Sequence, residues 1–146
     1  MTAVPAWLTR VQSDSMAPGL RDGQLVLTIR PRRKHRFRRG AIVAVDSREV
    51  RQRIVKRIIG LPGDHLRLDG NQVWVNGHLL DEPYASPATH RAIFVVPAGH
   101  YVLLGDNRHA SSDSRSWRHP YVSRLEIVGV LVRFLPSGLR GSSSLQ

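Results

Sequence analysis

The chain has 146 residues, of which 41% are apolar, and it contains no cysteine. This length and apolar content predict one globular domain, and the lack of cysteine excludes disulfides, thiolate metal sites and a cysteine nucleophile. The formal net charge is +11, and residues 30–39 alone contain seven Lys/Arg and no acid. We expect this run to be a solvated loop, because no recognition motif accompanies it that would predict nucleic-acid binding.

Short apolar segments separated by turn dipeptides follow one another along the chain and predict an all-β protein. Two of the turns, Asp69-Gly70 and Asn76-Gly77, favour positive φ and predict consecutive hairpins. No window has the periodicity of a long amphipathic helix, although residues 121–125 could form one turn. The predicted strands comprise residues 24–29, 41–45, 50–59, 65–68, 72–75, 78–80, 92–96, 101–104 and 127–134.

These strands predict a mainly antiparallel, bent β-sheet or partial barrel, with a small hairpin lobe at about residues 64–98. A single domain is expected over residues 1–136, with a loop at 82–90 and a flexible tail at 137–146. No apolar run approaches the roughly 20 residues that a membrane-spanning helix needs, and no leader segment opens the chain. As written, the chain is expected to be soluble.

Lysine is rare in this sequence, since only two of the 22 basic residues are lysines and one of them, Lys56, lies in the apolar segment 54–59. Arginine keeps its proton in proteins, whereas a buried lysine can lose it. Burial is expected to lower the pKa of Lys56 from about 10.4 toward 7–8, where an amine can act as a general base. Ser15, in a proline-containing turn, is the candidate nucleophile, because a Ser-Lys pair is a known alternative to Ser-His-Asp.

Four blocks of the chain resemble those of the type I signal peptidases, which are membrane-associated Ser-Lys proteases that remove secretory leader peptides. In chain order the blocks are residues 13–20 (SDSMAPGL), 39–43 (RGAIV), 56–64 (KRIIGLPGD) and 105–115 (GDNRHASSDSR). The last two match the family pattern almost letter for letter. Gly19 and Ala41 depart from it, because the family usually has Thr and Asp there. The resemblance covers about residues 7–136 and implies the all-β fold of that family.

The resemblance also implies a role for individual residues. Ser15 would be the nucleophile, Lys56 the general base and Ser111 the hydroxyl that orients the lysine amine. The Ser15 N–H and the Ser13 hydroxyl would form the oxyanion hole. The residues expected to form structural ion pairs are Arg57 with Asp106 and Asp113 with Arg115. Those expected to line a shallow substrate pocket are Met16, Leu20, Ile54 and Val55. No cofactor is implied, and none of the histidines has metal-ligand spacing.

The expected function is that of a serine endopeptidase that binds an extended peptide or preprotein and cuts it after small residues of the Ala-x-Ala type. One alternative is a soluble maturation protease with a single dedicated precursor, and another is a catalytically silent relative that binds peptides. A silent relative has no reason to keep Ser13, Ser15, Lys56 and Ser111 together, which favours an active enzyme. Self-cleaving repressors share the Ser-Lys chemistry but lack the 105–115 block.

The cellular location follows less directly from the sequence. As written, the chain is expected to be cytoplasmic or peripheral to a membrane, where the basic run at 30–39 and the apolar pair Trp7-Leu8 could give weak contact with an anionic bilayer. A fully solvated loop is the alternative, since no amphipathic helix supports insertion. If a membrane anchor has been removed from the natural protein, the expectation becomes a membrane-associated enzyme with an extracytoplasmic active site.

Overall fold

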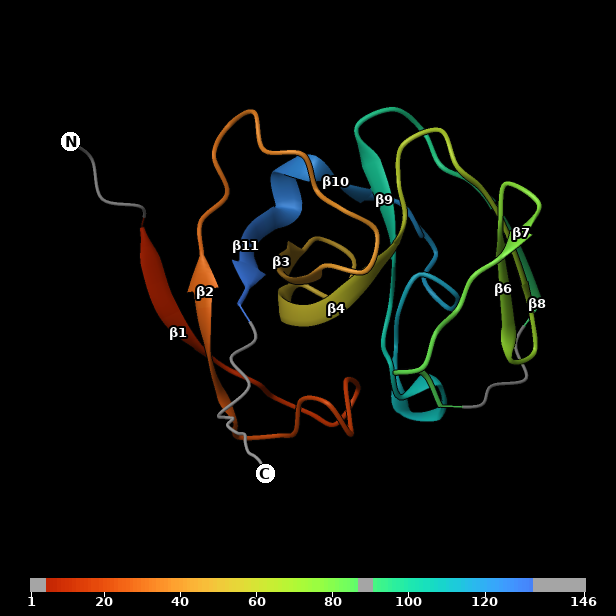
Figure 1. Cartoon of the computed structure of the whole chain (residues 1–146). Helices are drawn as coiled ribbons and strands as arrows, with labels where there is room; N and C mark the ends of the chain where they lie inside the picture. The colour runs from red at the N-terminus through yellow and green to blue at the C-terminus, as the bar shows by residue number, and fades with distance from the viewer. Residues whose placement is uncertain (1–4, 87–90, 133–146) are drawn as a thin grey trace, which may run out of the picture.

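A computed structural model describes residues 5–86 and 91–132 of the chain. Within these residues the structure consists of short strands and two single 3₁₀ turns, which confirms the predicted all-β class (Figure 1). The strands are β1 (Ala6–Arg10), β2 (Leu25–Ile29), β3 (Ile42–Ser47), β4 (Gln52–Gly60), β5 (His65–Asp69), β6 (Gln72–Val75), β7 (His78–Leu79), β8 (Arg91–Val95), β9 (His100–Leu104), β10 (Val122–Ser123) and β11 (Ile127–Leu131). The 3₁₀ turns are η1 (Arg108–Ala110) and η2 (Arg124–Glu126).

The strands form two antiparallel sheets that lie side by side in Figure 1. The larger sheet has the order β1-β2-β11-β3-β4-β9-β10, and the smaller one, which we call the small lobe, has the order β7-β6-β5-β8. The small lobe is built from the hairpins that the Asp-Gly and Asn-Gly turns predicted. In Figure 1, β1 lies at the end of the molecule farthest from the small lobe, and β9 lies next to the small lobe.

Three elements differ from the sequence predictions because tertiary pairing decides them. Residues 6–10 were not expected to form a strand, but β1 pairs with β2 from Ala6–Ile29 to Arg10–Leu25. The turn expected at 121–125 is instead the two-residue strand β10 followed by η2. The strand predicted over 127–134 is β11, which ends at Leu131. Residue 132 is described but is not in the strand, whereas residues 133–134 and the predicted tail at 137–146 lie outside the described residues.

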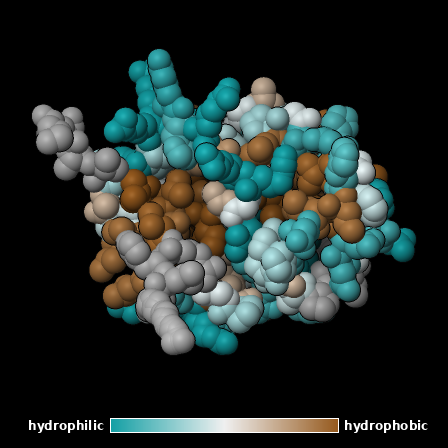
Figure 2. All heavy atoms as spheres, viewed as in Figure 1, coloured by the Kyte–Doolittle hydropathy of each residue, from teal (hydrophilic) through white to brown (hydrophobic). Residues whose placement is uncertain are grey.

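The larger sheet is buried on both faces at its centre. Along β3, Val43 and Val45 pack into one hydrophobic cluster, while Ile42 and Ala44 pack into another. Successive side chains of a strand point to opposite faces, so a strand with apolar residues at every position needs cover on both sides. Hydrophobic residues also reach the surface, and Figure 2 shows one group of them over the β1 and β2 side of the visible face and another toward the small lobe.

The small lobe leaves the larger sheet at Gly60, the last residue of β4. A Cβ atom at Gly60 would lie 2.6 Å from Leu66 Cδ1 and 2.9 Å from Val102 Cβ, so only glycine lets the two sheets approach this closely. Asp64 then closes the following turn, because its carboxylate accepts a hydrogen bond of 2.8 Å from the Leu61 N–H. The same carboxylate forms an ion pair of 3.0 Å with Arg39. This turn sets where β4 ends and therefore where Lys56 is held.

Candidate active site

Ser15 lies in a turn whose backbone conformation is stabilised by hydrogen bonds to side chains. Ser13 has φ +114°, which is unusual for a residue with a side chain, and its N–H donates to Asp22 Oδ1 at 2.8 Å. This conformation brings the Ser13 hydroxyl within 3.3 Å of both the Ser15 N–H and the Ser15 Oγ. Ser13 and the Ser15 N–H, the predicted oxyanion donors, are therefore adjacent.

Lys56 lies on β4, opposite Val43 of β3, and only 5% of its surface is exposed. Its Nζ donates a hydrogen bond of 3.1 Å to Ser111 Oγ. Burial lowers the pKa of Lys56 from 10.5 to about 8, an effect that the negative charge of Asp113 opposes and the positive charge of Arg115 assists. A lysine with this pKa is partly neutral near physiological pH and can accept a proton.

The Ser111 hydroxyl has its proton already committed. It donates to Asp113 Oδ2 at 2.8 Å, and the same carboxylate oxygen accepts from the Gly105 N–H at 2.9 Å. Burial favours the neutral form of Asp113, but hydrogen bonds and charge from Arg115 outweigh it and lower the pKa of Asp113. Because Asp113 stays charged and accepts the hydrogen bond from the Ser111 hydroxyl, Ser111 Oγ presents only lone pairs to Lys56. Lys56 must therefore donate to Ser111, which leaves the amine lone pair free in its neutral form.

Gly105 allows the Ser111 loop to pack against the Ser15 turn. A Cβ atom at Gly105 would lie 2.5 Å from Ser111 Cβ and 2.7 Å from the Ser15 carbonyl oxygen. Real Cβ atoms do not approach neighbours this closely, so a side chain at position 105 would separate the two loops. Close approach of two backbones is a reason for glycine that is independent of φ.

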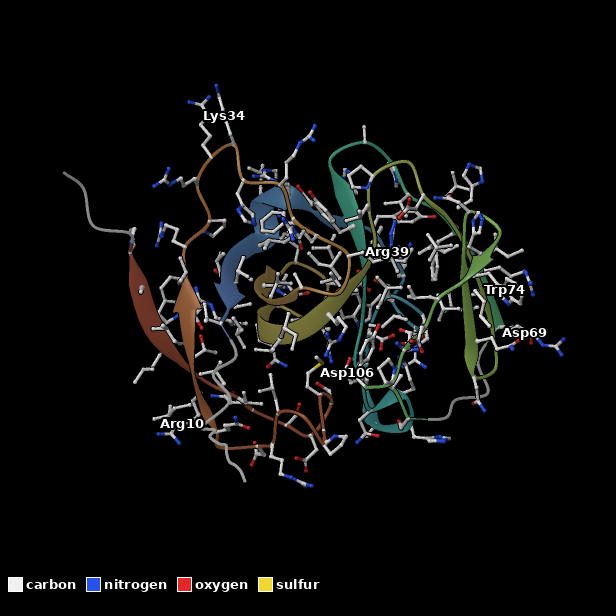
Figure 3. The ribbon with its side chains drawn as sticks, in the orientation of Figure 1. Arg10, Lys34, Arg39, Asp69, Trp74 and Asp106 are labelled. Atoms are coloured by element: carbon white, nitrogen blue, oxygen red, sulfur yellow. The ribbon has the colours of Figure 1, made fainter. Side chains whose placement is uncertain are left out.

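Arg57 follows Lys56 in β4 but interacts with a different set of groups. It forms two parallel hydrogen bonds with Asp106, at 2.8 and 2.7 Å, and donates to the Gly40 carbonyl oxygen at 2.8 Å. Its guanidinium group also stacks 3.8 Å from the centre of the Tyr84 ring. In Figure 3 Asp106 lies between the larger sheet and the small lobe. The predicted ion pair is thus present and buried, and a carboxylate balances the Arg57 charge.

Ser15 and Lys56 open into one cavity of about 240 Å³. Ile54 and Val55 line it, as the sequence predicted. Met16 and Leu20 do not: both are 1% exposed and pack in the core cluster with Val11. The expectation that they form the pocket surface is therefore wrong, because the turn after Ser15 directs these large apolar side chains into the protein interior. The other residues that line the cavity are Val11, Gln12, Ser13, Val50, Gln52, Arg53, Ala110 and Ser112.

The two predicted dyad residues share the cavity without a direct hydrogen bond. Among the described residues, the partner of Lys56 Nζ is Ser111 Oγ, and the partner of Ser15 Oγ is Ser13 Oγ. In this contact Ser13 Oγ is the donor and Ser15 Oγ the acceptor, so the contact does not use the Ser15 proton.

Comparison with known proteins places this arrangement in a family. The family described as signal peptidase, peptidase S26, matches residues 2–135 of the chain. The chain belongs to the signal peptidase family. The signal peptidase I of Bacillus licheniformis is 37% identical over 119 residues, which are 73% of this chain and 64% of that protein. A probable signal peptidase I-2 of Synechocystis is 38% identical over 136 residues, which are 86% of this chain and 62% of that protein.

A solved structure supports the same family assignment for this chain. The signal peptidase I of Enterococcus faecalis aligns with a TM-score of 0.60 at 31% identity and covers 67% of this chain and 98% of that one. The chain spans less than two thirds of the length of the curated relatives just named. Within the described residues, no helix is long and apolar enough to cross a membrane. No group of three or more His, Asp or Glu residues in those ranges is placed to hold a metal ion.

Sequence reasoning missed two features of this signal-peptidase site. Asn107, to which no role was given, clamps the nucleophile turn: its N–H donates to the Ser15 carbonyl oxygen at 2.9 Å and its side-chain amide to the Asp14 carbonyl oxygen at 3.0 Å. Its place in the 105–115 block was the available signal. A buried ion pair of 2.6 Å between Arg108 and Glu82 ties the same block to the predicted loop, and nothing local in the sequence indicated it.

Proposed function

We propose that this chain is a serine endopeptidase of the signal-peptidase type that cuts preproteins or other precursors after small residues. The observation that carries the proposal is the buried Lys56 amine, which is hydrogen-bonded to Ser111 at 3.1 Å and opens into the same cavity as Ser15. A surface-exposed or fully charged lysine would have no such use. The membership of the signal peptidase family supports the reaction class.

In the proposed reaction, Ser15 Oγ attacks the scissile carbonyl carbon as neutral Lys56 takes the Ser15 proton. The negative charge that develops on the carbonyl oxygen is stabilised by the Ser15 N–H and the Ser13 hydroxyl. The resulting Lys56 ammonium then gives its proton to the leaving amine, and an acyl-enzyme on Ser15 remains. In the second half, Lys56 takes a proton from the attacking water and returns one to Ser15 as the acyl group leaves.

The backbone next to the cavity supports binding of the substrate as an extended strand. The pairing of β4 with β9 begins at Arg57, so residues 52–56 have no β9 partner along that edge. An unpaired strand edge can accept an additional strand through main-chain hydrogen bonds, while pockets select alternate side chains. Ile54 and Val55 line the cavity together with Lys56, and their branched side chains would leave room for small substrate side chains.

The decisive experiment compares the chain with a Ser15→Ala variant. Both are incubated with precursor proteins of the source cell, and the new N-termini are sequenced. We expect cleavage after small residues that Ser15→Ala abolishes and that a control variant, Ser116→Ala in the loop outside the cavity, retains. Cleavage of many exported precursors indicates general processing, whereas cleavage of one protein indicates a dedicated maturation protease. Binding of peptides without any cleavage would refute the enzymatic function.

Weak contact with an anionic membrane is a further part of the proposal. Leu8 and Leu25, which are 61% and 51% exposed, lie on the β1–β2 hairpin next to the basic run at 30–39. Each basic residue near an anionic surface contributes on the order of 1 kcal/mol, which salt screens over about 8 Å. Sedimentation with anionic vesicles at low salt only would support peripheral contact, and none at either salt would exclude it.

A further inference from the structure

Two neighbouring cavities along the larger sheet share lining residues with the catalytic cavity. The second cavity, of about 290 Å³, lies along β1 and shares Gln12 and residues 52–55 with the catalytic one. The third, of about 490 Å³, shares Trp7 with the second. Arg53 lines all three. A bound peptide longer than the catalytic cavity would therefore pass Arg53.

Arg53 is held firmly but keeps free hydrogen-bonding capacity. Its Nε donates to Asp46 Oδ1 at 2.6 Å and its Nη2 to Asp46 Oδ2 at 3.0 Å. Its Nη1 has no partner among the described residues, and 49% of the side chain is exposed. Asp46 therefore fixes the position of the guanidinium group through Nε and Nη2, while the N–H donors of Nη1 stay available to a ligand. Such a group suits a carboxylate, which it can bind with charge and geometry.

The charges that line the second and third cavities are mostly positive. Arg10 lines the second, Arg30 and Asp46 line the third, and Arg53 lines both. Arg10 donates one hydrogen bond to the Gly23 carbonyl oxygen at 3.2 Å. The Arg30 guanidinium lies 6.0 Å from the centre of the Trp7 ring. Three arginines against one aspartate leave an excess of positive charge that attracts acidic side chains and repels basic ones.

We infer that Arg53 is a specificity-determining residue, which favours substrates with an acidic side chain at a position away from the scissile bond and disfavours those with a basic one there. This inference rests on the proposed proteolytic function and extends it to a substrate class. The catalytic cavity selects small residues at the cut, and the extended groove selects charge at a distance from it. Arg53 touches the substrate but not the reacting atoms.

The experiment uses a series of peptides that share one cleavable sequence and carry a single Glu, Gln or Lys at each successive position. The kcat/KM of each peptide is measured with the wild-type chain and with Arg53→Gln, Arg53→Lys and Arg67→Gln. Arg67 is the matched control, because it is a 51% exposed arginine that is also paired with an aspartate, on the small lobe. At one or two positions we expect the Glu peptide to be cut on the order of fivefold faster than the Lys peptide.

The Glu/Lys ratio within each variant separates this role from a general loss of activity. Arg53→Gln should lower the ratio toward one, Arg53→Lys should retain most of it, and Arg67→Gln should leave it as in the wild type. In the wild type the ratio should fall at high salt. Normal cleavage without a charge preference, or a preference that Arg53→Gln leaves intact, would overturn the inference alone. If the wild type cuts no peptide of the series, the proteolytic function fails and the inference fails with it.

Discussion

Replacement of Lys56 by methionine should stabilise the protein, and by an amount that depends on pH. The folded chain lowers the pKa of Lys56 from 10.5 to about 8, mainly by burial. That gap corresponds to about 3 kcal/mol of free energy that folding loses when the amine is charged. Solvent screens this cost very little, because only 5% of the residue is exposed. Methionine has similar length and no charge, so the Lys56→Met variant avoids this cost.

The sign of the pH dependence follows from which state binds more protons. Below pH 8 both the folded and the unfolded chain hold the Lys56 proton, and the cost is fully present. Between about 8 and 10.5 the unfolded chain holds it and the folded chain does not, so the free energy of unfolding of the wild type rises with pH. The stability advantage of Lys56→Met should therefore be largest at neutral pH and shrink by about 3 kcal/mol as the pH approaches 10.5.

Urea denaturation followed by tryptophan fluorescence measures this difference directly at several pH values. Other titrating groups contribute to both proteins and cancel in the comparison. The kcat/KM of the wild type provides a second measurement, and it should rise with pH through one group titrating near 8. Lys56→Arg should fold and be nearly inactive, because arginine keeps its proton. A stability difference that does not change between pH 8 and 10.5, or an active Lys56→Arg variant, would refute the neutral-lysine mechanism.

Other residues of the site give three further predictions. Ser13→Ala should lower kcat by on the order of 10²- to 10³-fold with unchanged stability, because it removes one oxyanion donor; kinetics that match the wild type would exclude Ser13 from the oxyanion hole. Asp106→Asn should lower the free energy of unfolding by about 3–5 kcal/mol in urea titrations, since it leaves Arg57 charged, buried and without its carboxylate partner. A decrease below about 1 kcal/mol would contradict this. Gly105→Ala should abolish activity, because its Cβ would lie 2.7 Å from the Ser15 carbonyl oxygen; full activity would show that the two loops can separate at no cost.

Local sequence patterns predicted much of the fold and part of the site. The Asp69-Gly70 and Asn76-Gly77 turns and the alternating apolar residues beside them led to the hairpins of the small lobe, because these signals depend on neighbouring residues only. The apolar residues around Lys56 led to the expectation of a buried amine for the same reason. The roles assigned to Ser15, Lys56 and Ser111 remain predictions that the experiments above test.

The strand-forming character of the chain, the family resemblance and the candidate catalytic residues could all be recognised in the sequence. Which side chains face the cavity depends on tertiary packing. Met16 and Leu20 follow Ser15 directly, yet they pack in the core, while Arg53, 38 residues beyond Ser15, lines the groove. The proton direction at Ser111 likewise depends on Asp113 and Gly105 meeting in space. These features arise from contacts between segments that are distant in the chain, and no local periodicity encodes them.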